Sequence, residues 1–332
     1  MRTILKKLAL FFSATIIVLL IAEIALRLLA PIYPVGNLGA YEYDAELGFR
    51  RKLALHDFET TDHQEETISN GLGTANFQSG FADYKHLIFA IGDSFTQGTG
   101  LPADMSYPAQ LDLMVNRDER GMYSKKFGVV NLGISGIGGE QELIILDRWS
   151  REIGDPSVVL YLGYDNDHED DLLFKSGYFH KSLVDGNPSW GPLVKPMQWL
   201  TSDVQIGLRT KLLISDLRHR SVIGSAPSDN GASVAEMESS VLQRLLEYIH
   251  QHNARLVVSW STNGDSYIWL KEWAARNEVQ FADWAPRVDS VKAAIPDLPI
   301  ENQHSGGHHR GWVNTIIAQE YAAAIEADFP TR

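Results

Sequence analysis

The sequence predicts an α/β fold with a doubly wound, mostly parallel sheet, and two observations lead to this prediction. Short runs that are apolar on both faces recur along the chain, and such runs are typical of strands buried on both sides of a parallel sheet. They lie at residues 86–92, 127–133, 157–163, 254–260 and 279–284. Segments of helical periodicity separate them, and the alternation of strands with helices predicts that helices cover the sheet.

Three segments carry the helical pattern most clearly. They cover residues 139–154, 233–253 and 315–328. In the second segment, Ser233 and Glu236 match a capping box, and an apolar residue recurs every three or four positions. We therefore expect a helix over 233–253 that buries one apolar face.

The N-terminus predicts a membrane anchor over residues 1–32. Residues 8–22 carry no charge and the apolar character continues to Ile32, and roughly 20 residues are enough to cross a bilayer core. A cleaved signal peptide is the alternative, although no clear A-x-A cleavage site follows. Basic residues precede the span and none lies between Arg27 and Arg50. This asymmetry predicts that the body lies outside the cytoplasm, which is the periplasm if the source is a Gram-negative bacterium.

The rest of the chain is expected to form two parts. Residues 33–85 are polar and predict a membrane-proximal segment that packs on the main domain, which covers residues 86–332. At about 172–232 the alternation of strands and helices breaks, which indicates an insertion. Trp190 and Trp199 lie in this insertion and are candidates to stack on a sugar ring.

Composition excludes several classes of site. The chain has no cysteine, so disulfides, thiolate metal sites and a Cys nucleophile are excluded. The net charge of −13 argues against nucleic acid as a partner. A dinucleotide cofactor is disfavoured because GDSFTQG, and not G-x-G-x-x-G, follows the first predicted strand. Asp165, Asp167, Asp170 and three histidines offer metal ligands, but their spacing matches no zinc motif. We therefore expect neither a cofactor nor a metal.

Chemically active groups follow the first three predicted strands and precede the last helix. They are Ser94 after the first strand, Gly136 after the second, Asn166 after the third, and the histidines at 304, 308 and 309. Ligands bind at the carboxyl ends of the strands in an open parallel sheet, so we expect these groups to meet at one edge. A hydroxyl, a backbone amide, a side-chain amide and an imidazole are the groups that acyl transfer needs.

The motifs around these residues resemble the GDSL/SGNH hydrolase family, in its membrane-anchored bacterial branch. GDSFTQG is similar to the first block of the family, NLGISG to the second, YDNDHEDD to the third and GGHHRGWVNTIIA to the histidine block. AEIALRLLAP and YEYDAELGFR extend the resemblance toward the N-terminus. The resemblance implies a flavodoxin-like three-layer sandwich with a mostly parallel five-stranded sheet. It also implies Ser94 as nucleophile, the Gly136 amide and the Asn166 side chain as parts of an oxyanion hole, and His308 as general base. In the third block, one residue too many separates Gly163 from Asn166.

The acid that orients the histidine is left open by the sequence. In the family it normally lies three residues before the histidine, where this chain has Ser305. Glu301, Asp297 or a backbone carbonyl is then the group that orients His308. Glu301 also forms an E-x-x-H pattern with His304, which makes His304 the alternative histidine.

The resemblance and the anchor together predict a membrane-anchored, extracytoplasmic serine esterase. It would cleave O-acyl esters, O-acetyl esters among them, on a carbohydrate or a lipid-like substrate through an acyl-enzyme. One alternative is an O-acyltransferase that uses the same residues and passes the acyl group to a polysaccharide. Another is a catalytically degenerate subunit that serves as a binding or scaffold component of an envelope assembly complex.

Overall fold

The computed structural model describes most of the chain. The described residues are 2–30, 40–58, 66–78, 80–117, 122–179, 204–207, 209–210, 213–214, 217, 234–302 and 307–328. The chain divides into two compact units. The first unit comprises residues 1–34 and 186–225, and the main unit comprises residues 35–185 and 226–332.

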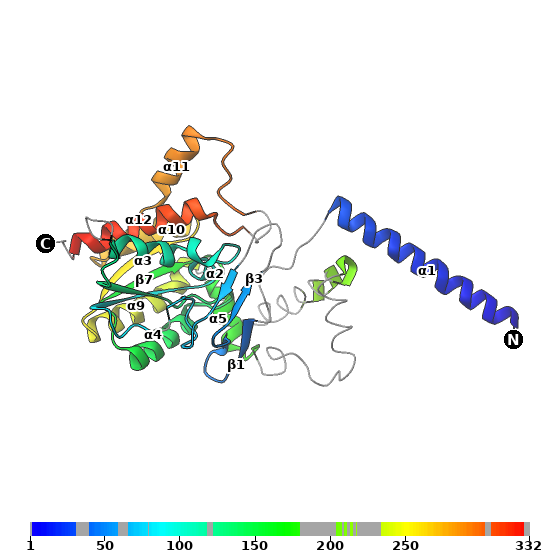
Figure 1. Ribbon diagram of the computed structural model, residues 1–332, viewed down its shortest axis with the longest axis horizontal. Helices are drawn as coiled ribbons and strands as arrows, with labels where there is room; N and C mark the ends of the chain where they lie inside the picture. The colour runs from blue at the N-terminus through cyan, green and yellow to red at the C-terminus, as the bar shows by residue number, and fades with distance from the viewer. Residues whose placement is uncertain are drawn as a thin grey trace. The chain divides into compact units, whose positions relative to one another are not determined.

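A five-stranded parallel sheet forms the centre of the main unit (Figure 1). In sheet order its strands are β6 (Phe127–Asn131), β5 (His86–Gly92), β7 (Val158–Gly163), β8 (Arg255–Trp260) and β9 (Gln280–Phe281). All neighbouring pairs are parallel. The first strand of this sheet along the chain lies between the second and the third, which is the flavodoxin-like order of a doubly wound sheet. The predicted fold class is confirmed.

Helices cover both faces of this sheet (Figure 1). On one face, α3 (Tyr107–Asn116) contacts α12 (Gly311–Asp328). On the other face, α4 (Gly139–Ile153) contacts both α5 (Asp167–Lys175) and α9 (Val234–Gln251). The main unit also contains the helices α2 (Ser94–Gln97), α10 (Asp265–Arg276) and α11 (Ala285–Ala294). Because both faces are covered, every residue of β6 and β7 is buried, which explains their apolar character on both sides.

Two short antiparallel hairpins precede the sheet, in a segment where the sequence shows no strand pattern. β1 (Tyr41–Asp44) pairs with β2 (Gly48–Arg51), and β3 (His56–Phe58) pairs with β4 (Glu66–Ile68). Strands of three or four residues are too short to show a clear alternation. Leu47, in the turn between β1 and β2, is buried in the same hydrophobic cluster as the strands of the sheet. The first hairpin is therefore part of the core of the main unit.

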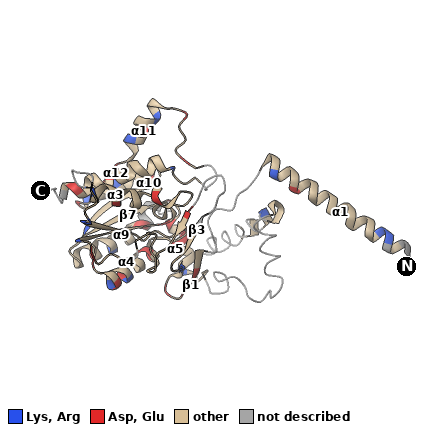
Figure 2. Ribbon diagram, in the orientation of Figure 1, with Lys and Arg blue, Asp and Glu red and all other residues tan. Residues whose placement is uncertain are grey.

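The first unit contains α1 (Arg2–Leu29). Its 24 residues Lys6–Leu29 have a mean hydropathy of 2.5, and they are long and apolar enough for a membrane span or a signal sequence. Figure 2 shows charged side chains only toward the two ends of this helix. Glu23 accepts hydrogen bonds from the backbone N–H groups of Gln205 (2.9 Å) and Ile206 (3.1 Å). Part of the predicted insertion thus contacts the predicted anchor.

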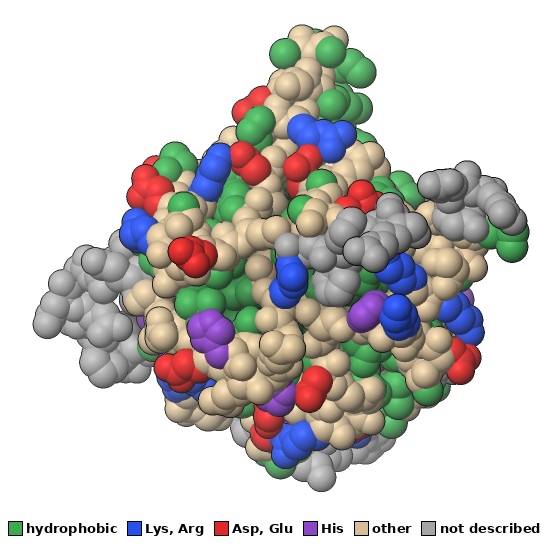
Figure 3. Space-filling view, turned by 90° about the vertical axis from the view of Figure 1, so that its left-hand side faces the viewer, with side chains coloured by type: hydrophobic (Ala, Val, Ile, Leu, Met, Phe, Trp, Pro, Cys, Tyr) green, Lys and Arg blue, Asp and Glu red, His purple; other side chains and the backbone are tan. Residues whose placement is uncertain are grey.

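Four carboxylic acids are buried near the start of α4. Charged side chains are otherwise typical of the surface, and on the face shown in Figure 3 acidic and basic side chains are interspersed. The buried acids are Glu142, Asp167, Asp171 and Glu238. Neither carboxylate oxygen of Glu142 or Glu238 has a hydrogen-bond partner among the described residues. Burial raises the pKa of all four, to about 6 for Asp171 and to about 8 for Glu238. Glu238 is therefore mostly protonated at neutral pH.

We predict that Glu238→Gln weakens the pH dependence of stability. An unfolded glutamic acid has a pKa of about 4.3, whereas burial raises the pKa of Glu238 to about 8, so the folded state holds this proton more tightly. This contribution is complete below a pH of about 4 and is lost as the pH rises through about 8. Because glutamine needs no proton, the variant should lose less free energy of unfolding than the wild type between pH 5 and pH 8.

Chemical denaturation of the full chain at the two pH values measures this difference. Glu247→Gln, at an exposed position of the same helix α9, is the matched control. The same loss of unfolding free energy in Glu238→Gln and in the wild type would show that the prediction is wrong.

Candidate active site

Ser94 begins α2 directly after the carboxyl end of β5. Asp93 caps this helix, because its Oδ1 accepts the backbone N–H of Phe95 at 2.9 Å. The turn depends on Gly92, whose φ is +149°. A Cβ at Gly92 would lie 2.2 Å from Thr96 Oγ1, so only glycine fits. The sequence therefore forms a tight strand-to-helix turn with Ser94 at the edge of the sheet.

His308 lies next to Ser94 in space, although 214 residues separate them in the chain. Its Nε2 is 2.7 Å from Ser94 Oγ, and its ring packs against the ring of Phe95 with centroids 4.8 Å apart. The backbone of His308 is tied to the preceding segment, because His308 O accepts the N–H of Asn302 at 2.8 Å. A hydroxyl within hydrogen-bond reach of an imidazole is the arrangement that general-base activation of a serine requires.

Asp93 is a second partner of the Ser94 hydroxyl. Ser94 Oγ lies 3.0 Å from Asp93 Oδ2, to which it can donate. The Asp93 side chain is fully buried, and burial raises its pKa. The single hydroxyl proton can point to only one acceptor at a time, so Asp93 and His308 share the contact with Ser94 Oγ.

Gly136 lies in the loop that follows β6, with a φ of +79° that favours glycine. This loop packs against α2. A Cβ at Gly133 would lie only 2.4 Å from the backbone N of Gln97, and the N–H of Ser135 donates to Gln97 Oε1 at 2.8 Å. The structure thus brings the loop of Gly136 beside the helix that begins at Ser94.

Asn166 lies after β7, at the N-terminal end of α5. Its Nδ2 donates to Asp170 Oδ2 at 2.9 Å, and burial followed by neighbouring carboxylates raises the pKa of Asp170 to about 7. The additional residue of this block, Asp165, has partners of its own at the end of β8. Its carboxylate accepts the indole N–H of Trp260 at 3.0 Å and the hydroxyl of Thr262 at 2.8 Å. Asp165 is therefore held toward β8, and the extra residue has a structural explanation.

Glu301, the candidate acid, lies beside the histidine loop. Glu301 is exposed, and its backbone forms an antiparallel bridge with that of His309. Its carboxylate lies near Gly307, because its Oε2 would be 3.7 Å from a Cβ placed there. Its role as the orienting acid stays a prediction. The alternative histidine, His304, lies outside the described residues. Within the described part of the chain, no three His, Asp or Glu side chains are placed to share a metal ion.

His309, the residue after His308, is buried in the main unit. Its Nε2–H donates to the carbonyl oxygen of Ser261 at 2.6 Å, and its ring lies 5.3 Å from Trp284 and 5.0 Å from Phe95. Burial lowers the pKa of His309 to about 4, so the ring is neutral at pH 7. His309 therefore links the histidine loop to the end of β8, while its neighbour His308 contacts Ser94.

Comparisons with known proteins give structural neighbours only. No family model matches the sequence, and no curated protein matches it. One similar solved structure is a member of the lipolytic protein G-D-S-L family from Veillonella parvula, which is 12% identical with a TM-score of 0.42 and covers 74% of this chain and 99% of its own. Another is an alpha/beta hydrolase enzyme from the metagenome of Lake Arreo, which is 12% identical with a TM-score of 0.39 and covers 74% of this chain and 96% of its own. At such low similarity, the residues of this chain have to carry any functional conclusion.

We predict that His309→Ala destabilises the fold. The substitution removes a buried ring and leaves the carbonyl oxygen of Ser261 without its donor, which should cost about 2–4 kcal/mol of unfolding free energy. Chemical denaturation of the full chain measures this loss. His250→Ala, at an exposed position of α9, is the control and should change stability little. Wild-type stability in His309→Ala would contradict a buried structural role.

Proposed function

We propose that this protein is a membrane-anchored serine esterase that cleaves O-acyl esters through an acyl-enzyme. The observation that supports this most strongly is the 2.7 Å contact between His308 Nε2 and Ser94 Oγ at the carboxyl edge of the sheet. A serine hydroxyl alone is a weak nucleophile at neutral pH, and an imidazole at this distance can accept its proton during attack. An intact pair of this kind argues against the alternative of a degenerate scaffold subunit.

In the proposed mechanism, Ser94 Oγ attacks the ester carbonyl while its proton passes to His308 Nε2. The backbone amides of Ser94 and Gly136 and the second N–H of the Asn166 amide then donate to the negatively charged oxygen of the tetrahedral intermediate. His308 returns the proton to the leaving alcohol, and the acyl group stays on Ser94. Water, activated by the same imidazole, attacks this acyl-enzyme and releases the acid.

The substrate class follows from where the chain is expected to lie. The apolar helix α1 fits a membrane span, and the distribution of basic residues around it favours a body outside the cytoplasm. O-acyl groups, O-acetyl among them, on an envelope carbohydrate or a lipid-like molecule are the esters within reach there. If a sugar hydroxyl enters in place of water, the same residues perform acyl transfer. Trp190 and Trp199, the candidate sugar-stacking residues, lie outside the described residues.

We predict that a fluorophosphonate probe labels the wild-type protein and that Ser94→Ala abolishes labelling. The probe reacts with a serine only when a base removes its proton and donors hold the developing oxyanion. Mass spectrometry of the labelled peptide locates the adduct. Ser106→Ala removes a neighbouring buried hydroxyl, which bonds to the carbonyl of Ala103, and should label like the wild type.

Release of acetate from a panel of acetylated glycans, with and without an acceptor sugar, then distinguishes hydrolysis from transfer. A folded wild-type protein that neither takes up the probe nor releases acetate would contradict the proposed enzyme and favour the scaffold alternative.

A further inference from the structure

The side chain of Gln97, the last residue of α2, collects three hydrogen bonds on one oxygen atom. Gln97 Oε1 accepts the hydroxyl of Tyr41 at 2.8 Å, an Nη2–H of Arg51 at 2.9 Å and the backbone N–H of Ser135 at 2.8 Å. Gln97 lies three residues after Ser94, and Ser135 directly precedes Gly136. This oxygen therefore joins the nucleophile helix to the loop that carries the second oxyanion donor.

Tyr41 and Arg51 approach Gln97 together because the first hairpin pairs them. They are direct partners across the antiparallel strands β1 and β2, and the side chains of directly opposite residues lie on the same face of a hairpin. Arg51 makes a second contact from the same atom, since Nη2 also donates to the carbonyl oxygen of Gly133. One guanidinium thus holds both α2 and the loop 132–136.

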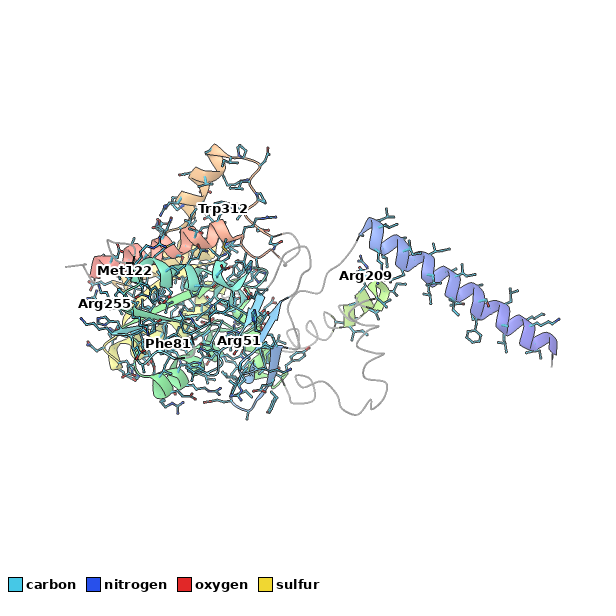
Figure 4. All side chains as sticks on the ribbon, viewed as in Figure 1. Arg51, Phe81, Met122, Arg209, Arg255 and Trp312 are labelled. Atoms are coloured by element: carbon cyan, nitrogen blue, oxygen red, sulfur yellow. The ribbon has the colours of Figure 1, made fainter. Side chains whose placement is uncertain are left out.

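Arg51 is unusual because it is a cation buried in the interior of the main unit. Its side chain is 1% exposed, and no described carboxylate forms an ion pair with it. Two of its nitrogens, Nε and Nη1, have no hydrogen-bond partner among the described residues. Burial lowers the pKa of Arg51 to about 10, which still leaves it charged at neutral pH. Burying a charge is costly for folding. If Arg51, labelled in Figure 4, served only to fill space in the core, an apolar residue would stabilise the fold better.

We propose that Arg51 and Tyr41 are positioning residues for the oxyanion hole, which they hold in place through Gln97. This inference rests on the proposed esterase function. Because Gln97 Oε1 accepts the N–H of Ser135, the peptide unit between Ile134 and Ser135 is fixed in orientation. The next N–H in the chain is that of Gly136, one peptide unit further on. The positive charge of Arg51 also favours negative charge in the loop to which it is bonded.

Steady-state hydrolysis of p-nitrophenyl acetate by the full chain tests this inference. Arg51→Met should lower kcat by about tenfold or more, because small displacements of catalytic donors have large effects, with KM changed less than about twofold. Tyr41→Phe leaves Gln97 with two donors and should lower kcat by about two- to tenfold. Arg51→Lys keeps the positive charge but loses the planar arrangement of guanidinium N–H donors. Its kcat should lie between those of Arg51→Met and the wild type.

Gln97→Glu separates positioning from mere stability. The new carboxylate gives Arg51 an acidic partner that none of the described residues provides, so the thermal midpoint should rise or stay unchanged. It also places a negative charge beside the oxyanion loop, so kcat should fall by about tenfold. A purely structural role would move stability and activity in the same direction.

Arg148→Met is the matched control. Arg148 forms ion pairs with Asp44 and Glu46 at the end of the same hairpin, and no hydrogen bond of the described residues joins it to Gln97 or to the loop 132–136. Its loss should lower the thermal midpoint and leave kcat unchanged. Wild-type kcat in Arg51→Met and Gln97→Glu, with an active wild type, would overturn this inference alone. A wild type that neither hydrolyses the ester nor takes up a fluorophosphonate would overturn the proposed function and this inference with it.

Discussion

The hydrogen bond between Ser94 and His308 is the interaction on which the site depends. It joins two residues that are 214 positions apart in the chain, and neither has its proposed role without the other. Ser94 is fixed by the turn after β5, and His308 by the loop before α12. The parallel sheet makes the contact possible because it brings the ends of strands that are remote in the chain to one edge.

Aromatic packing around Phe95 also holds Ser94 and His308 in contact. The ring of Phe95, the residue after the nucleophile, lies against His308, His309 and Tyr164, with centroid distances of 4.8–5.0 Å. One side chain of α2 thereby sets the positions of the histidine loop and of the loop after β7. His309, bonded to Ser261, adds a fixed point at the end of β8. The base is thus positioned by packing as well as by its hydrogen bond.

Much of the fold could be predicted from the sequence, and the parts that could not share a physical cause. The run at 86–92 is strand β5 to the residue, because a buried strand that ends at a glycine turn has clear limits. The run at 279–284 pairs as a strand only at Gln280–Phe281. Beyond this pairing, the ring of Trp284 packs against Tyr267 of α10. The hairpins of residues 41–68 were beyond prediction because their strands are too short to show a period.

The same distinction applies to the site. Ser94, Gly136 and Asn166 follow strands and could be placed at one edge from the order of the chain. Arg51 and Gln97 could not, because their importance comes from a hydrogen bond across 46 residues and from the absence of an acidic partner among the described residues. Neither property has a local pattern. The sequence shows only where they lie: Gln97 is part of the motif GDSFTQG, and Arg51 directly follows the motif YEYDAELGFR.

Chemical rescue of His308→Ala is the most direct test of the pairing between Ser94 and His308. Without its base, the variant should react with a fluorophosphonate far more slowly than the wild type, because the hydroxyl keeps its proton. Free imidazole can enter the space of the missing ring, so labelling of Ser94 should recover as the imidazole concentration rises. Wild-type labelling of His308→Ala in the absence of imidazole would contradict the account.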